Sequence, residues 1–128
     1  MRRLLLDTRV FLWWLAESPR LGVAARGLVE DGANDVFVSA ATGWEIAIKR
    51  ALGKLEAPES LGEAIGAEGF EHLPISFAHG ERAGALPPYH RDPFDRLLIA
   101  QAQSESLEIV TANQHIPRYA VTCLSADT

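Results

Sequence analysis

Cysteine is almost absent from this sequence of 128 residues. The single cysteine, Cys123, excludes an internal disulfide, and it lacks the second cysteine or neighbouring histidine that a zinc site would need. A lone thiol of this kind fits the reducing cytoplasm. We expect Cys123 to be a buried strand residue.

Long hydrophobic runs are also missing. Asp7 stops the apolar residues 4–6 far short of the hydrophobic region of a signal peptide, and the run 10–16 is too short to span a bilayer. The sequence therefore predicts a cytoplasmic protein that is neither exported nor inserted in a membrane. Its length and its hydrophobic content of 48% predict a single domain, residues 1–128, with a real core.

Positive charge is scarce as well. The chain has 12 Lys and Arg residues against 17 Asp and Glu residues, which gives a net charge of −5. A protein that binds nucleic acid through a broad basic surface needs clustered Lys and Arg, so the composition argues against that class. It still allows an enzyme whose acidic residues hold a cation.

Short apolar runs alternate with amphipathic segments along the chain. Short apolar runs predict strands at residues 4–6, 36–39, 70–75 and 108–111, and residues 119–124 predict an edge strand. Helical spacing is found in residues 9–17, 21–30, 42–53, 76–86 and 93–106, and a short helix begins at 57–59. This alternation predicts an α/β fold of three layers, in which helices flank a central, mostly parallel sheet of about five strands.

The stretch 90–100, His-Arg-Asp-Pro-Phe-Asp-Arg-Leu-Leu-Ile-Ala, concentrates charge at the start of the helix 93–106. Asp92 can cap this helix, and Pro93 suits its first position. Asp95 falls in the first turn, where free backbone N–H groups favour an anion. Ordinary helix capping therefore explains either acid when it is considered alone.

Glu45 has a similar ordinary explanation. Residues 42–45, Thr-Gly-Trp-Glu, match a capping box in which Thr42 is the N-cap. Lys49 lies one helical turn beyond Glu45 and can pair with it.

Considered together, the acids are harder to explain as caps. Asp7 follows the first strand, Glu45 begins the helix after the second, and Asn113 follows the fourth. Because the carboxyl ends of parallel strands meet at one edge, we expect these side chains and Asp95 to converge there. Close carboxylates repel one another and must take up protons or share a cation. Oxygen ligands suit Mg²⁺ or Mn²⁺, which would also orient a phosphate and activate water.

Three blocks of the chain, in this order, resemble the PIN-domain ribonucleases, and among them the VapC-type toxins of bacterial toxin–antitoxin pairs. Residues 4–8 resemble the family's opening strand and first acid, residues 44–49 with 53–55 its second-acid block, and residues 90–102 its third. The resemblance covers essentially the whole chain. It implies a PIN-like fold and a cytoplasmic endoribonuclease that uses Mg²⁺ or Mn²⁺ to hydrolyse RNA phosphodiester bonds. It also implies a homodimer, inhibited by a small antitoxin protein whose tail enters the active-site cleft.

Carried over by position, the resemblance implies that Asp7 and Asp95 are the main metal ligands. Glu45 would help to hold the metal or orient the attacking water. Thr8 would support the first acid through its hydroxyl or its backbone.

Other residues near these blocks have less specific roles. Arg91 and Arg96 are candidates for phosphate contacts, although solvent-facing or antitoxin-facing roles are equally open. We expect His90 to be a structural hydrogen-bonding residue of its loop. The tryptophans fall on helices with apolar neighbours, which favours packing or a dimer surface over base stacking: Trp13, Trp14 and Trp44.

The chain departs from the family pattern after its fourth strand. Residues 110–113 are Val-Thr-Ala-Asn, where the family commonly has an acid at the last position. Asn113 can ligate a metal through its carbonyl oxygen or hold a metal-bound water, but it adds no charge. Arg9 stands where we expect histidine, and it could lower metal occupancy or bind phosphate.

Three alternatives follow from the same residues. A catalytically weakened PIN domain would act mainly by binding protein or RNA, which Asn113 favours. A phosphoacceptor signalling domain needs adjacent acids after the first strand and a lysine after a late strand, and the chain has neither. A DNA-directed nuclease is also open, because no residue identifies the ribose 2′-hydroxyl.

Overall fold

All strands of the protein join one sheet. The structure is a computed structural model that describes residues 1–128. The five strands are all parallel and are arranged in the order β3-β2-β1-β4-β5, which confirms the predicted α/β architecture. Their bounds are β1 (Arg3–Leu6), β2 (Asp35–Ser39), β3 (Glu71–Leu73), β4 (Glu108–Thr111) and β5 (Cys123–Ser125).

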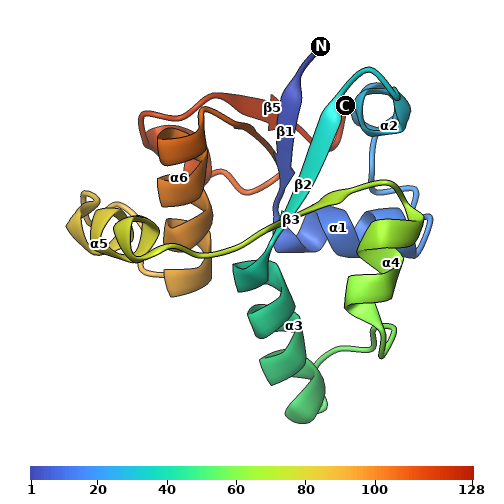
Figure 1. Ribbon diagram of the computed structural model, residues 1–128, viewed down its shortest axis with the longest axis horizontal. Helices are drawn as coiled ribbons and strands as arrows, with labels where there is room; N and C mark the ends of the chain where they lie inside the picture. The colour runs from blue at the N-terminus through green and yellow to red at the C-terminus, as the bar shows by residue number, and fades with distance from the viewer.

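Helices cover both faces of this sheet. In Figure 1, α1, α2 and α4 lie on one side of the strands, α5 and α6 lie on the other, and α3 projects from the end of β2. No helix is long and apolar enough to cross a membrane. The helices are α1 (Thr8–Leu15), α2 (Val23–Glu30), α3 (Ala40–Ala51), α4 (Leu61–Ala67), α5 (Phe77–Ala85) and α6 (Pro93–Glu105), with a 3₁₀ turn, η1 (Ile116–Arg118).

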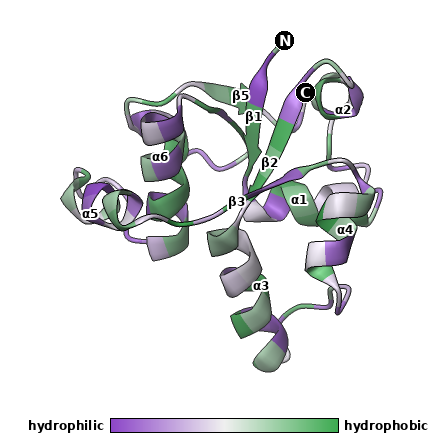
Figure 2. Ribbon diagram, in the orientation of Figure 1, coloured by the Kyte–Doolittle hydropathy of each residue, from purple (hydrophilic) through white to green (hydrophobic).

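The central strand β1 separates two halves of the core. Side chains alternate across a strand, so Leu4 and Leu6 pack into one apolar cluster with residues of α1, α2 and α4. Leu5 points to the opposite face, where it packs with residues of α6. Figure 2 shows β1 and β2 coloured hydrophobic along most of their length. This burial on both faces holds the end of β1, and with it Asp7, at the middle of the sheet edge.

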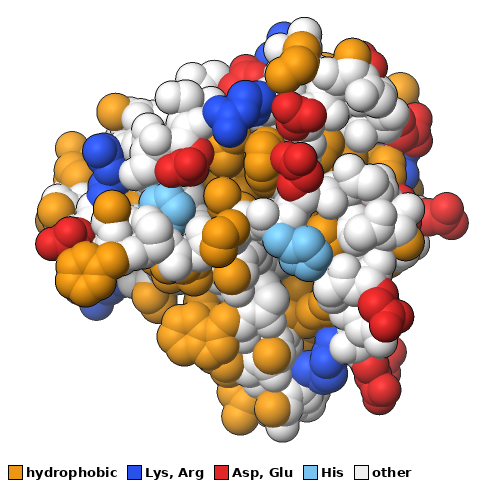
Figure 3. Space-filling model, in the orientation of Figure 1, with side chains coloured by type: hydrophobic (Ala, Val, Ile, Leu, Met, Phe, Trp, Pro, Cys, Tyr) orange, Lys and Arg blue, Asp and Glu red, His pale blue; other side chains and the backbone are white.

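The surface carries no extended basic area on the face shown in Figure 3, where positive side chains are scattered among acidic and apolar ones.

The tryptophans are partly packed, as expected. Trp13 and Trp14 contact the apolar cluster of α1, whereas Trp44 is 57% exposed and touches Phe94 edge to face, with 5.1 Å between ring centroids.

Helix α3 begins earlier than the sequence predicted. Ser39 is its N-cap, and its hydroxyl accepts a hydrogen bond from the N–H of Ala41 at 3.0 Å. Thr42 is buried inside the helix, where its hydroxyl contacts that of Thr8 at 3.1 Å. The predicted capping box is therefore wrong. Both Ser39 and Thr42 suit an N-cap, but the hydroxyl of Thr42 is used in the tertiary contact with Thr8. Glu45 consequently lies in the second turn and caps nothing.

Other boundaries differ by smaller amounts. Helix α4 begins at Leu61 rather than at 57–59. The last strand begins at Cys123 rather than at 119, because residues 119–121 form a bend that follows η1. Cys123 is half-buried rather than buried, because β5 is an edge strand. By contrast, α6 confirms its prediction: Asp92 caps it by accepting from the N–H groups of Phe94 and Asp95, and Pro93 is its first residue.

Candidate active site

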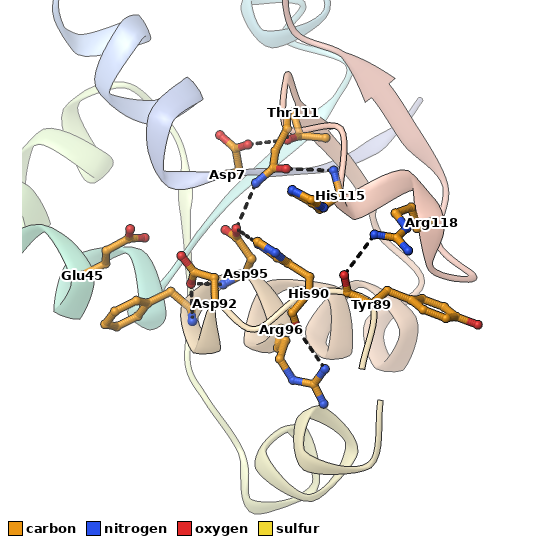
Figure 4. Close-up of polar contacts among 12 residues, drawn as sticks. Asp7, Glu45, Tyr89, His90, Asp92, Asp95, Arg96, Thr111, His115 and Arg118 are labelled. Atoms are coloured by element: carbon orange, nitrogen blue, oxygen red, sulfur yellow. Dashed lines mark hydrogen bonds and ion pairs between the residues drawn. The ribbon is translucent and has the colours of Figure 1, made fainter. Parts of the chain in front are cut away.

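One cleft of about 340 Å³ lies at the carboxyl-end edge of the sheet. Asp7 reaches it from the end of β1, Glu45 from α3, Asp95 from the first turn of α6 and Asn113 from the segment after β4. The structure thus brings together the side chains that the sequence analysis placed at this edge. Figure 4 shows the carboxylates of Asp7, Glu45 and Asp95 around a common space, together with that of Asp92.

Asp7 is the most constrained of these acids. Its side chain caps α1 by accepting from the N–H of Val10 at 2.8 Å, and it accepts from the hydroxyl of Thr111 at 2.5 Å. The pKa of Asp7 is raised to about 6, chiefly by burial and also by the charge of Asp95, although the hydrogen bonds from Thr111 and Val10 and the charge of Arg9 act to lower it. Asp7 therefore changes its charge close to neutral pH.

Asp95 is held by two donors on the same oxygen. His90 Nε2 lies 2.8 Å from Asp95 Oδ2, and Asn113 Nδ2 donates to that oxygen at 3.0 Å (Figure 4). Burial raises the pKa of Asp95, the His90 hydrogen bond lowers it, and the charges of Asp92 and Glu45 raise it. Asp7, Asp95 and Glu45 thus share one electrostatic environment in which negative charge is costly.

Glu45 carries an unsatisfied buried atom. Its side chain is 7% exposed, and Oε2 accepts from Lys49 Nζ at 2.6 Å. Oε1 is buried and has no hydrogen-bond partner. A buried carboxylate oxygen without a donor costs free energy, so such an atom calls for a ligand. Together with the raised pKa values of its neighbours, this oxygen fits a hard divalent cation such as Mg²⁺ or Mn²⁺.

Asn113 acts as a hydrogen-bonding link between three parts of the site. Its N–H donates to Thr111 Oγ1, its Nδ2 donates to Asp95, and its Oδ1 accepts from the N–H of His115. These partners fix the orientation of the amide, because His115 offers a donor and Asp95 an acceptor. The side chain therefore supports Asp95 without adding charge to the cleft.

Thr8 and Arg96, which the sequence placed around the site, have other partners. The hydroxyl of Thr8 contacts Thr42, and Thr111 supplies the hydroxyl that supports Asp7. The guanidinium of Arg96 donates to four backbone carbonyls between residues 83 and 90 and to the hydroxyl of Tyr119, so it is not a free phosphate contact. Arg96 instead ties the segment before α6 to that helix. Arg91 is exposed and lies outside the cleft lining.

Several lining residues were not selected from the sequence as site residues. Lys54 and Asp92 line the cleft, and so do Lys49 and His90, to which the sequence gave ordinary structural roles. One ligand atom each of His90, Asp92 and Asp95 lies within 4.8 Å of the other two. These three side chains could therefore also contribute ligands to a cation. Thr111 could have been found by the argument that selected Asn113, because it ends the same strand.

Comparisons with known proteins identify the family of the chain. The PIN domain family matches residues 4–121. Ribonuclease VapC22 of Mycobacterium tuberculosis (strain ATCC 25618 / H37Rv) is 32% identical over 124 residues, which span 91% of this chain and 91% of that protein.

Solved structures share the fold. VapBC2 from Rickettsia felis, bound to a DNA fragment from its promoter, gives a TM-score of 0.70 at 17% identity and covers 95% of this chain and 97% of that one. FitAcB from Neisseria gonorrhoeae gives 0.69 at 22% identity, with 96% and 97% covered. Because the family match spans most of the chain and the curated relative is similar over nearly all of it, this chain belongs to the PIN-domain family and resembles its VapC-type ribonucleases.

Proposed function

We propose that the protein is an endoribonuclease that depends on Mg²⁺ or Mn²⁺, the toxin of a toxin–antitoxin pair. One observation carries the proposal: carboxylates from three separate elements, Asp7, Glu45 and Asp95, line a single cleft in which Glu45 Oε1 is buried without a partner. The similarity to a ribonuclease, VapC22, supports RNA as the substrate.

In this proposal Asp7 and Asp95 hold the cation, and Glu45 completes the site through Oε1. A divalent cation bound there would polarise the scissile phosphate and make the attacking water more acidic. The protein's own residues set the geometry. Thr111 fixes Asp7. His90 and Asn113 fix Asp95 on Oδ2, which leaves its other oxygen to face the cleft.

We also propose an antitoxin partner and a homodimer that acts in the cytoplasm. The antitoxin partner is supported by a toxin–antitoxin complex from Klebsiella pneumoniae, which is similar in fold to this chain with a TM-score of 0.66 at 20% identity. An antitoxin tail that entered the cleft would compete with RNA for the same acids and cations.

The test is cleavage of a small-RNA pool by the purified chain, free of antitoxin. We expect fragments with Mn²⁺ and with Mg²⁺, and none with a chelator. Asp95→Asn should abolish the fragments while circular dichroism shows an unchanged fold. Cleavage that persists in this variant, or in chelator, would refute the assigned site.

Asn113 favours a second candidate, a weakened PIN domain that acts mainly by binding protein or RNA. The fourth position here contributes a hydrogen bond to Asp95 and no negative charge, which lowers the attraction for a cation. A folded chain that cuts no RNA and binds no Mn²⁺ at millimolar concentration would support this candidate over the nuclease.

A further inference from the structure

We propose that Lys54, with Arg9, forms the contact surface for the phosphates of a single-stranded RNA substrate. This inference rests on the proposed nuclease function and concerns the same cleft. Arg96 was one of two candidates for a phosphate contact in the sequence, with other roles equally open, and its guanidinium is fully used within the chain.

The distribution of lysine is the first observation. The chain has ten arginines but only two lysines, Lys49 and Lys54, and both lysines line the acidic cleft. Arg9 lines it from α1. A flexible ammonium suits a phosphate that moves during a reaction, because it acts as a point charge without a fixed plane.

The end of α3 positions Lys54. Gly53 has φ +70°, which lies in the left-handed region, and its N–H donates to the carbonyl of Arg50 at 3.0 Å. The N–H of Lys54 donates to the carbonyl of Lys49 at 2.9 Å. These two hydrogen bonds form a Schellman motif, which turns the chain back at the helix end. The turn directs Lys54 to the same cleft as Lys49.

The three cations differ in how free they are. Lys49 is paired with Glu45, whereas neither Arg9 nor Lys54 takes part in any of the ion pairs of the chain. Both are exposed, so binding a phosphate costs little desolvation. Lys54 and Arg9 are therefore available to an incoming anion in a way that Lys49 is not.

The charge of the cleft becomes more suitable for RNA when a divalent cation binds, or when one of the carboxylates is removed as in Asp95→Asn. Four carboxylates and three cations line it, which gives a formal charge of −1 with His90 neutral. One divalent cation would change this to +1. Arg96 lies near the site, but its guanidinium is occupied by backbone carbonyls and is not free for a phosphate. The cleft is thus where the few cations of an acidic protein can act on a polyanion.

The test is RNA binding in an Asp95→Asn background, which prevents cleavage. The probe is a fluorescein-labelled single-stranded RNA of mixed sequence, and the readout is fluorescence anisotropy at several salt concentrations with Mg²⁺ present. Lys54→Ala should weaken binding by about 3- to 10-fold and reduce the slope of log K against log salt by about 0.7, the value for one phosphate contact on a single strand. Lys54→Arg should restore most of the affinity.

Two further variants provide controls. Arg82→Ala removes an exposed cation on α5, outside the cleft, and should change affinity by less than about 2-fold. Gly53→Ala keeps all charges but strains the turn that positions Lys54, so it should weaken binding with circular dichroism unchanged.

Chemical labelling gives an independent readout. Lys49 and Lys54 are the only lysines, so limited acetylation followed by mass spectrometry reports on each of them directly. RNA should slow the acetylation of Lys54 several-fold relative to a lysine-containing reference peptide. If the parent binds RNA, but Lys54→Ala binds equally well and RNA does not protect Lys54, the inference is overturned and the nuclease proposal survives. If the Asp95→Asn protein binds no RNA, the inference is overturned, and the cleavage assay on the unmodified chain decides the nuclease proposal separately.

Discussion

At the scale of single residues, the strongest conflict in the molecule is at Asp7. It serves as the N-cap of α1, for which a carboxylate is well suited, yet it is buried beside Asp95, where a carboxylate is costly. A residue selected only for stability at this position would keep the cap and lose the charge. A charge that costs stability here supports the metal-binding role proposed for Asp7.

Asp7→Asn should stabilise the cation-free protein at neutral pH. The folded-state pKa of Asp7, about 6, lies above its ordinary value of 3.8, so the folded state binds the proton more tightly than the unfolded state. Its contribution to stability is thus full below about pH 4 and is lost as the pH rises through 6. Asparagine keeps the cap without the charge, and we expect a gain of about 1–3 kcal/mol at pH 7.5.

Urea unfolding in chelator at pH 7.5 and at pH 4.5 would measure this. The advantage of the variant should shrink at the lower pH. A variant no more stable than the parent at pH 7.5 would show that the Asp7 charge is already compensated.

Arg96 shows the opposite case, a charged residue near the site that is structural. Its planar fork reaches the carbonyls of Ala83 and Leu86 through one nitrogen and that of Pro87 through the other. Lysine cannot reproduce this geometry, so Arg96→Lys should destabilise the fold by about 2–4 kcal/mol although the charge is kept. Thermal unfolding compared with Arg91→Lys, at an exposed neighbour, would check it; equal melting temperatures would contradict the role given to Arg96.

At the scale of elements, the sequence predicted best where local signals and tertiary structure agree. Helix α6 was predicted with its cap, because Asp92 and Pro93 meet no competing contact. Strand β1 was predicted from an apolar run that the sheet buries on both faces. The start of α3 was missed, since either Ser39 or Thr42 suits an N-cap and only the contact with Thr8 separates them.

The same reasoning explains what could be predicted of the site. Asp7 and Asn113 follow strands and Asp95 lies in the first turn of a helix, so the topology of a parallel sheet was enough to bring them together. Glu45 lies in the second turn of α3, later than the sequence predicted, and still lines the same cleft. Lys54 could not be placed in this way, because its position depends on a left-handed turn beyond a helix end. The available signals were a glycine followed by lysine after an amphipathic helix, and the place of residues 53–55 in the block that resembles the family's second-acid block.

The N-cap of α3 can be tested with a matched pair of variants. Ser39→Ala removes the hydroxyl that caps α3 and also donates to Gln101 Oε1 at 2.6 Å in the buried interior. We expect a loss of about 1–3 kcal/mol of stability. Ser60 stands at the N-cap of α4 but makes no capping hydrogen bond, so Ser60→Ala should be nearly neutral. Chemical denaturation of both variants would measure these effects. Equal denaturation midpoints for Ser39→Ala and Ser60→Ala would contradict the role given to Ser39.

At the scale of the whole molecule, the sheet order puts β1 between β2 and β4. Because α3 follows β2 and the segment of Asn113 follows β4, the ends of three adjacent strands supply the cleft, and α6 approaches it from one side. No single element contains the site. Any ligand of the cleft therefore binds the folded chain and not the unfolded one.

Divalent cations should consequently stabilise the whole fold. A ligand that binds only the folded state adds about 2.7 kcal/mol at 100 times its Kd, which corresponds to several degrees in melting temperature for a domain of this size. We expect Mn²⁺ to raise the melting temperature of the parent at pH 7.5, and the rise to decline below about pH 6 as Asp7 takes up its proton. Asp95→Asn should reduce the rise strongly, whereas sodium chloride at matched ionic strength should not reproduce it in the parent. An equal rise in both proteins would mean that the cation binds elsewhere on the acidic surface. The metal centre proposed here would then be wrong, although the fold, which the family match establishes, would stand.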